Sequence, residues 1–235
     1  FVFTLLQANA QTADYIIRNG KLIDGTGNQW QYKDVAIKGN QIIAIGNLKN
    51  WKATREIDAK GLIVAPGFID VHGHLEGGEF RNPLASNFLY DGVTTVVTGN
   101  CGGSAENLNT YFNHLDSIGM SINIASLIGH NTIRKQVMGS ANRHATEAEM
   151  QQMEKIAAQA MQDGAVGMST GLIYIPGTYA PTEEIVRLAK VIASKGGVYA
   201  SHIRNEENQV VDAVNEAIQI GRAATIPVEI SHFKI

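Results

Sequence analysis

The feature that most constrains the fold is a regular alternation, after Pro66, of short apolar runs with amphipathic segments of helical character. The apolar runs begin near Gly67, Val93, Ile122, Ala165, Gly197 and Pro227. One intervening segment starts with Thr146 and Glu149 at capping-box spacing and stops at Gly164, and another has Thr182 as its expected N-cap. This alternation predicts parallel βαβ units, and a period of roughly 30 residues favours a (β/α)8 barrel over a doubly wound sheet.

The segment before Pro66 has a different pattern, in which short strand-like stretches are separated by tight turns. Asn19-Gly20 and Gly39-Asn40 lie between apolar alternations, which is the pattern of β-hairpins. We expect a small, partial β-sandwich-like domain over residues 13–66 and the N-terminal part of the barrel over residues 67–235. The barrel is expected to be incomplete, because about six strand–helix units are present and a closed (β/α)8 barrel has eight.

Residues 1–12 are interpreted as the remainder of a secretory signal peptide or as a disordered chain end. Phe1–Leu6 are mostly apolar, and Gln7–Ala10 has the small-x-small form of a signal-peptidase site. The first interpretation predicts a periplasmic or secreted protein, and the alternative is a cytoplasmic one.

Charge and hydropathy argue against two classes of partner. The formal net charge is -3, the isoelectric point is about 6.2, and the chain has no run of Lys or Arg that would attract nucleic acid or anionic lipid. No apolar run reaches the roughly 20 residues that a membrane span needs. We therefore expect no nucleic-acid partner and no membrane partner, and the oligomeric state is left open.

Residues that can bind a metal ion recur at the C-terminal ends of the apolar runs. They are His72, His74, Cys101, His130, His202 and His232. In a (β/α)8 barrel these strand ends meet at the face where the active site is built. Cys101 is the single cysteine of the sequence, so it is a metal ligand, a nucleophile or a packing residue rather than half of an internal disulfide. Its place among strand-end histidines favours the metal ligand.

One thiolate and two imidazoles form a ligand set that suits zinc. Cys101, His202 and His232 supply this set and leave a fourth coordination position open. His72 and His74 are two apart on an expected strand, so both side chains should point to the same side. Zinc in such a site would polarise a water or a substrate carbonyl, which indicates hydrolytic chemistry.

Several stretches of the chain resemble the amidohydrolase superfamily, specifically its N-acyl-D-amino-acid deacylase (D-aminoacylase) branch. They are APGFIDVHGH, GVTTVVTGNCG, SLIGHNTIR, GAVGMSTGLIYIPGTYA, YASHIRNE and EISHFK. The His-x-His motif alone marks only the superfamily, whereas the cysteine together with STGLIYIPGTYA and SHFK indicates this branch. The resemblance extends from about Asp14 to the last residue and implies a TIM-type metal-dependent hydrolase barrel.

The resemblance also implies a ligand assignment. One tightly bound zinc is expected on Cys101, His202 and His232, and a second, weaker or transient metal on His72 and His74. Other branches place a carboxylated lysine at the fourth strand, but AVGMSTGLIY contains no lysine, consistent with a cysteine in the bridging position. The branch commonly reads His-Thr-His followed by acidic residues, whereas this chain reads HGHLEGGEF. The family's general base is an aspartate after the eighth strand, expected beyond Ile235.

Five further residues are weaker candidates. Lys234 could meet a substrate carboxylate, as the resemblance suggests, or be solvated. Tyr174 could donate to a carbonyl, shape the pocket or pack. His130 could support a metal ligand, face the substrate or be a satisfied buried histidine. Arg204 and Glu206 are expected to brace the loop after the fifth strand, the alternative being ordinary surface charge.

The expected function is zinc-dependent hydrolysis of the amide bond of a small-molecule N-acyl-D-amino acid, giving a carboxylate and a free D-amino acid. Zinc would polarise the carbonyl, water would attack, and the aspartate would move the proton to the leaving amine. The preference for D-substrates comes from the resemblance alone, and the acyl group and side chain are left open. The alternatives are another amidohydrolase, dihydroorotase-like or β-aspartyl-dipeptidase-like, and a non-catalytic scaffold on the same fold.

Overall fold

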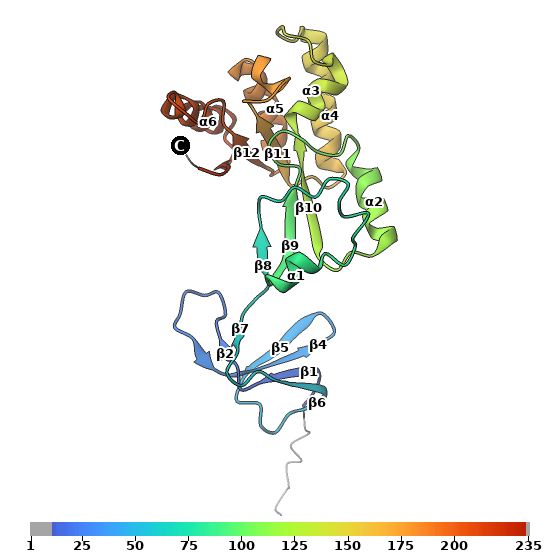
Figure 1. Cartoon of the computed structure of the whole chain (residues 1–235), viewed down its shortest axis with the longest axis vertical. Coiled ribbons are helices and arrows are strands. Elements are labelled where there is room, and N and C mark those ends of the chain that lie inside the picture. The colour runs from blue at the N-terminus through green and yellow to red at the C-terminus, as the bar shows by residue number, and fades with distance from the viewer. Residues whose placement is uncertain (1–10, 234–235) are drawn as a thin grey trace, which may run out of the picture. The chain divides into compact units, whose positions relative to one another are not determined.

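A computed structural model describes residues 11–233 of the chain (Figure 1). These residues divide between Gly67 and Phe68 into two compact units. The predicted signal-peptidase site at Gln7–Ala10 and the candidate Lys234 lie outside the described residues, so export of the protein stays a prediction. None of the described helices combines the length and the apolar character needed to cross a membrane.

The first unit contains two small sheets. Its strands are β1 (Thr12–Arg18), β2 (Lys21–Leu22), β3 (Gln31–Tyr32), β4 (Asp34–Lys38), β5 (Gln41–Gly46), β6 (Lys52–Asp58) and β7 (Ile63–Val64). One sheet has the order β5-β4-β1-β6 and the other the order β3-β2-β7. Strand β1 begins within the segment assigned to the signal-peptide remainder, because Thr12 pairs with Lys52 of β6.

One of the two predicted hairpins forms. Gly39 and Asn40 join the antiparallel strands β4 and β5, with Gly39 at a φ of 56°. The hairpin prediction for Asn19-Gly20 was wrong, since these residues carry the chain from β1 in one sheet to β2 in the other. A Cβ atom on Gly20 would lie 2.4 Å from Cγ2 of Val64, so close packing against β7 requires this glycine.

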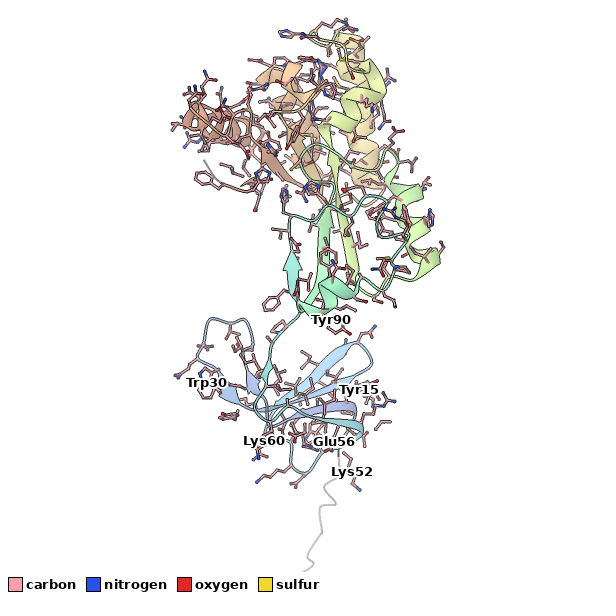
Figure 2. The ribbon with its side chains drawn as sticks, viewed as in Figure 1. Tyr15, Trp30, Lys52, Glu56, Lys60 and Tyr90 are labelled. Carbon is pink, nitrogen blue, oxygen red and sulfur yellow. The ribbon has the colours of Figure 1, made fainter. Side chains whose placement is uncertain are left out.

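Arg18 of β1 ties the first unit together. Its guanidinium donates hydrogen bonds of 2.7 and 2.6 Å to the carboxylate of Glu56, which is labelled in Figure 2. It also donates to the backbone oxygen atoms of Leu48 and Trp51, both at 3.2 Å. The hydrogen bonds from Arg18 to the Glu56 carboxylate lower the pKa of Glu56. Among the described residues, the groups that could hold a metal ion all lie in the second unit.

The second unit is a parallel sheet that curls like half of a barrel, in the order β8-β9-β10-β11-β12-β13 (Figure 1). Its strands are β8 (Phe68–Asp70), β9 (Val93–Thr98), β10 (Asn123–Gly129), β11 (Gly167–Gly171), β12 (Val198–His202) and β13 (Val228–Ile230). Its helices are α1 (Ser86–Tyr90), α2 (Leu108–Ile118), α3 (His130–Met138), α4 (Glu147–Gln162), α5 (Thr182–Ala193), α6 (Val210–Ala224) and the 3-10 helix η1 (Gly177–Tyr179). The predicted incomplete TIM-type barrel is thereby confirmed.

The largest hydrophobic cluster of the second unit joins its helices to its strands. Met153 of α4 and Ile185 of α5 pack in the same buried cluster as Met168 of β11 and Tyr199 of β12. All four side chains are fully buried. Burial of this apolar surface is the main favourable contribution to the stability of the unit. Because all six strands pair in parallel, their C-terminal ends meet along one edge of the sheet.

The predicted start of α4 is confirmed and that of α5 is wrong. Oγ1 of Thr146 accepts a hydrogen bond from the backbone N–H of Glu149, whose carboxylate accepts one from the backbone N–H of Thr146. At α5 the N-cap is Pro181, and Thr182 is already helical. The Thr182 hydroxyl instead donates a 2.8 Å hydrogen bond to Glu216 of α6.

Candidate metal centre

Cys101 lies in a tight turn that follows β9, and its φ of 53° is in the left-handed region. The turn is held by Ser169 of β11, whose Oγ accepts from the backbone N–H of Gly102 at 2.9 Å and donates to the oxygen of Gly99 at 2.5 Å. The side-chain amide of Asn100 donates to the backbone oxygen of Val97 at 2.9 Å. The thiol is therefore presented by a backbone that neighbouring strands fix from two sides.

Glycine is required at the entrance of this turn. Gly99 has a φ of 76°, and a Cβ atom there would lie 2.1 Å from the backbone oxygen of Leu127 on β10. A side chain at this position would push the turn away from the sheet. Gly99 is thus needed because the backbone at the start of the Cys101 turn packs directly on strand β10.

His72 and His74 follow β8 rather than lying on it. Strand β8 ends at Asp70, whose carboxylate accepts a hydrogen bond from the backbone N–H of His72 at 3.0 Å. The N–H of Gly73 then donates to the oxygen of Val97 at 2.9 Å, so the segment still runs beside β9. The expectation that both histidines lie on a strand was wrong, but their rings are neighbours, with centroids 5.2 Å apart.

The two other predicted histidine ligands, His202 and His232, come from the opposite edge of the sheet, near β12 and β13. His202 is the last residue of β12, and His232 lies in the turn that follows β13 with a φ of 33°. The Sγ atom of Cys101 is 3.4 Å from Nδ1 of His202 and 3.5 Å from Nε2 of His232. It is also 3.5 Å from Nε2 of His72. Three of the predicted histidine ligands therefore surround the sulfur atom of Cys101.

These residues form two groups that could hold a metal ion, and Cys101 belongs to both. In each group the potential ligand atoms lie within 4.8 Å of one another. The first group is His72, His74 and Cys101, and the second is Cys101, His202 and His232. A soft thiolate combined with neutral imidazoles is the donor set that zinc prefers. The residues present therefore fit the metal that the sequence predicts.

The surroundings favour the neutral, metal-binding form of His72. Burial lowers the pKa of its imidazole, and the nearby rings of His74 and His232 lower it further. A neutral ring keeps a lone pair for a metal ion. His202 is buried, while His74 is exposed, so the second group is more enclosed than the first.

Tyr174 lies beside the second group. Its ring centroid is 4.7 Å from that of His202, and about half of its surface is exposed, at 49%. A partly exposed phenol next to a proposed ligand can contact a bound molecule, so the structure is compatible with the predicted substrate role. Lys234, the other candidate for substrate contact, lies outside the described residues, and its role stays a prediction.

His130 takes part in a buried polar network. It is the first residue of α3 and is completely buried. Its Nε2 atom lies 2.9 Å from a carboxylate oxygen of Glu184 on α5, and its Nδ1 atom lies 3.3 Å from the side chain of Asn131. Arg134 approaches the same carboxylate at 3.6 Å. Of the readings left open for His130, that of a satisfied buried histidine is the one this environment favours.

Arg204 and Glu206, which we expected to act together as a brace, have separate partners. Arg204 donates to Glu216 at 2.8 and 2.9 Å and to the backbone oxygen atoms of Thr178 and Ala180. It therefore does brace the loop. Glu206 instead lies 2.8 Å from Nδ1 of His232. Sequence reasoning missed this contact, because Glu206 and His232 belong to different segments that only the fold brings together.

The geometry defines a parallel half-barrel with a candidate metal centre at its C-terminal strand ends, and comparison with known proteins identifies its family. The model of the Amidohydro_3 family, described as an amidohydrolase family, matches residues 55–225. The chain belongs to this amidohydrolase family. Within it, the similarity is to the D-aminoacylase branch, as the sequence motifs predicted.

The individual similarities are high over nearly all of the chain. D-aminoacylase of Alcaligenes xylosoxydans xylosoxydans is 36% identical over 97% of the chain and 52% of its own length. One solved structure is of a D-aminoacylase, described by its binuclear metal centre with one-metal activation and second-metal attenuation. It has a TM-score of 0.90 at 36% identity, and the match covers 94% of this chain and 51% of the D-aminoacylase chain.

A third similar protein is the N-acyl-D-glutamate deacylase of Bordetella bronchiseptica. It was solved with zinc and a phosphonate that mimics the tetrahedral intermediate, and its TM-score is 0.89 at 37% identity, over 93% of this chain and 51% of its own. The chain thus spans about half the length of the curated relatives and solved structures it matches.

Proposed function

We propose that the protein hydrolyses the amide bond of N-acyl-D-amino acids with the help of zinc, releasing a carboxylate and a free D-amino acid. The observation that carries the proposal is the convergence of Cys101, His202 and His232 at the C-terminal ends of three strands, with ligand atoms within 4.8 Å of one another. Membership of the amidohydrolase family and similarity to characterised D-amino-acid deacylases support the substrate class.

In this proposal Cys101, His202 and His232 hold the tight zinc. His72 and His74 share Cys101 with it and form a second site of lower affinity. Bound zinc would supply Lewis-acid activation of the amide carbonyl and of water. The role of the protein is to keep the thiolate and the imidazoles in place before substrate arrives, which Ser169, Asn100 and Gly99 do for Cys101.

Two residues are proposed to contact the substrate. Tyr174 is placed to contact the acyl amide, because its ring lies beside His202 and is half exposed. Lys234 is proposed to bind the carboxylate that every N-acyl amino acid carries, since an ammonium group is a suitable partner for an anion. Together they would select a small anionic amide.

The substrate class is tested with the complete natural protein and matched enantiomers. Zinc-loaded protein is assayed against N-acetyl-D-methionine, N-acetyl-D-glutamate and their L-forms, and the free amino acids are quantified. We expect release of D-amino acids and at least a tenfold preference over the L-forms, a difference of about 1.4 kcal/mol in activation free energy. If zinc-loaded protein hydrolyses no acylated amino acid, the proposal is overturned, and another amidohydrolase activity or a non-catalytic scaffold takes its place.

The metal assignment is tested with two variants of the same protein. Cys101→Ala should lose both the tight zinc and the activity, because it removes the sulfur atom next to which the imidazoles of His202 and His232 lie. His72→Asn should keep one tight zinc and have reduced activity, because His72 belongs to the other group. Metal analysis decides between outcomes: unchanged zinc in Cys101→Ala would refute the assignment, and loss of all metal in both variants would refute the division into two sites.

A further inference from the structure

Glu206 is placed against the two histidines of the proposed tight zinc site. It lies in the segment between β12 and α6, and only 18% of its side chain is exposed. The same oxygen atom, Oε1, is 2.8 Å from Nδ1 of His232 and 3.6 Å from Nε2 of His202. A single carboxylate oxygen therefore contacts both imidazoles, at hydrogen-bond distance for His232 and ion-pair distance for His202.

The nitrogen atoms that face Glu206 are not those that face the thiol. Cys101 lies against Nε2 of His232 and against Nδ1 of His202. Each ring is thus placed between the carboxylate and the sulfur, with opposite nitrogen atoms turned to the two sides. The rings lie at 72° to each other with centroids 4.3 Å apart, so the two lone pairs on the thiol side converge.

This arrangement determines which nitrogen of each ring carries the proton. A neutral imidazole has one N–H donor and one lone pair, and a carboxylate is an acceptor only. The 2.8 Å contact with Glu206 favours a proton on Nδ1 of His232 and leaves the lone pair on Nε2. The same carboxylate oxygen, 3.6 Å from Nε2 of His202, favours by its charge a proton on that nitrogen and a lone pair on Nδ1. Carboxylates that accept the second N–H of a ligand histidine orient the ring and make it a stronger ligand.

We propose that Glu206 is a positioning residue of the zinc site, which fixes both histidine ligands in the tautomers that point their lone pairs toward Cys101. This inference rests on the proposed function through the metal site alone and does not depend on the substrate. Its particular consequence is that two ligands from different segments, the last residue of β12 and the turn after β13, depend on one carboxylate. Glu206 thereby supplies part of the zinc affinity without touching the metal ion.

The adjacent residues provide the contrast needed for a test. Arg204 points to Glu216 and belongs to the loop brace. Glu207 has an exposed side chain, and its backbone N–H and backbone oxygen make hydrogen bonds with Asn205 and Val210. Glu207→Gln therefore changes the same charge at the next position in the chain and serves as the matched control for Glu206→Gln.

The test measures metal affinity in the complete natural protein. Apo-protein is titrated with zinc in competition with a chelator, and the visible spectrum of the cobalt(II)-loaded form is recorded. We expect Glu206→Gln to weaken zinc binding by about 10- to 100-fold and to shift the cobalt ligand-field bands. Glu206→Asp, which keeps a carboxylate on a shorter side chain, should lie between Gln and the wild type. Glu207→Gln should match the wild type.

Three results would overturn the proposal. They are wild-type zinc affinity in Glu206→Gln, an equal loss in the Asp and Gln variants, and an equal loss in Glu207→Gln. Thermal unfolding of the apo-proteins separates a folding defect from a metal defect, and Glu206→Asp keeps the test decisive if Glu206→Gln does not fold. A zinc affinity that depends on Glu206 in a protein that hydrolyses no N-acyl-D-amino acid would count against the proposed substrate and leave this inference standing.

Discussion

Ser169 is the residue through which strand β11 reaches the Cys101 turn. Its fully buried hydroxyl accepts from the N–H of Gly102 and donates to the oxygen of Gly99. Strand β11 has no lysine where other branches of the superfamily are expected to place a carboxylated one. Its Ser169 contacts the backbone of the Cys101 turn. A serine in GMSTG carries no metal-ligand signal, so sequence reasoning passed over it. Its role depends on a contact between residues 67 positions apart.

Removal of the Ser169 hydroxyl should affect stability and metal binding together. Ser169→Ala leaves a buried N–H and a buried carbonyl without this partner, which costs about 1–3 kcal/mol in the free energy of unfolding. A loosened Cys101 turn should also bind zinc more weakly. Denaturant unfolding and zinc titration of the complete protein measure the two effects.

The matched control is Ser194→Ala at the end of α5, where an exposed hydroxyl donates to the oxygen of Val191. We expect this control to change the free energy of unfolding by no more than about 0.5 kcal/mol. If Ser169→Ala keeps the stability and zinc affinity of the wild type, the hydroxyl does not hold the turn.

At the scale of single elements, local patterns predicted well where local interactions decide. The start of α4 is set by Thr146 and Glu149, three residues apart, and it was predicted correctly. The start of α5 was not, because the Thr182 hydroxyl bonds to Glu216 on another helix. Likewise, β8 ends at Asp70 before reaching His72, since the side chain of Asp70 turns the backbone. The spacing of apolar residues along the sequence does not predict side-chain hydrogen bonds such as those of Thr182 and Asp70.

The capping box of α4 offers a quantitative check at this scale. Thr146→Ala removes the acceptor for the Glu149 N–H and should lower the free energy of unfolding by about 1 kcal/mol. Thr110→Ala, at an exposed position within α2, is the control and should leave stability unchanged or slightly higher, because alanine is the better helix former. Urea denaturation measures both. An equal effect of the two substitutions would show that the box contributes nothing.

For the whole molecule, strand–helix alternation predicted the parallel order of the sheet and the gathering of His72, Cys101, His202 and His232. This worked because the topology of parallel units places all C-terminal strand ends on one side. What could not be predicted was how side chains from distant segments orient one another. The contacts of Glu206 with His232 and of His130 with Glu184 arise from tertiary packing alone.

The open sheet leads to a prediction about the 235-residue chain in isolation. Within the described residues, β8 and β13 are the outer strands, and near them Phe68, Ile69 and Phe233 are 61%, 63% and 73% exposed. Unpaired edges flanked by exposed apolar side chains favour association. We expect this chain by itself to bind a hydrophobic dye and to elute as aggregates in size-exclusion chromatography. A monomer that unfolds cooperatively and binds no dye would contradict this expectation.

The sharing of Cys101 between two ligand groups has a consequence during synthesis of the protein. Cys101 and His232 are 131 positions apart, so at about 5–20 residues per second the thiol leaves the ribosome roughly 7–26 s before its last partner. Throughout that interval His72 and His74 have already been made. A zinc ion that meets the nascent chain would therefore be held first by the earlier group and pass to the later one, with Cys101 as the common ligand, once β13 has joined the sheet.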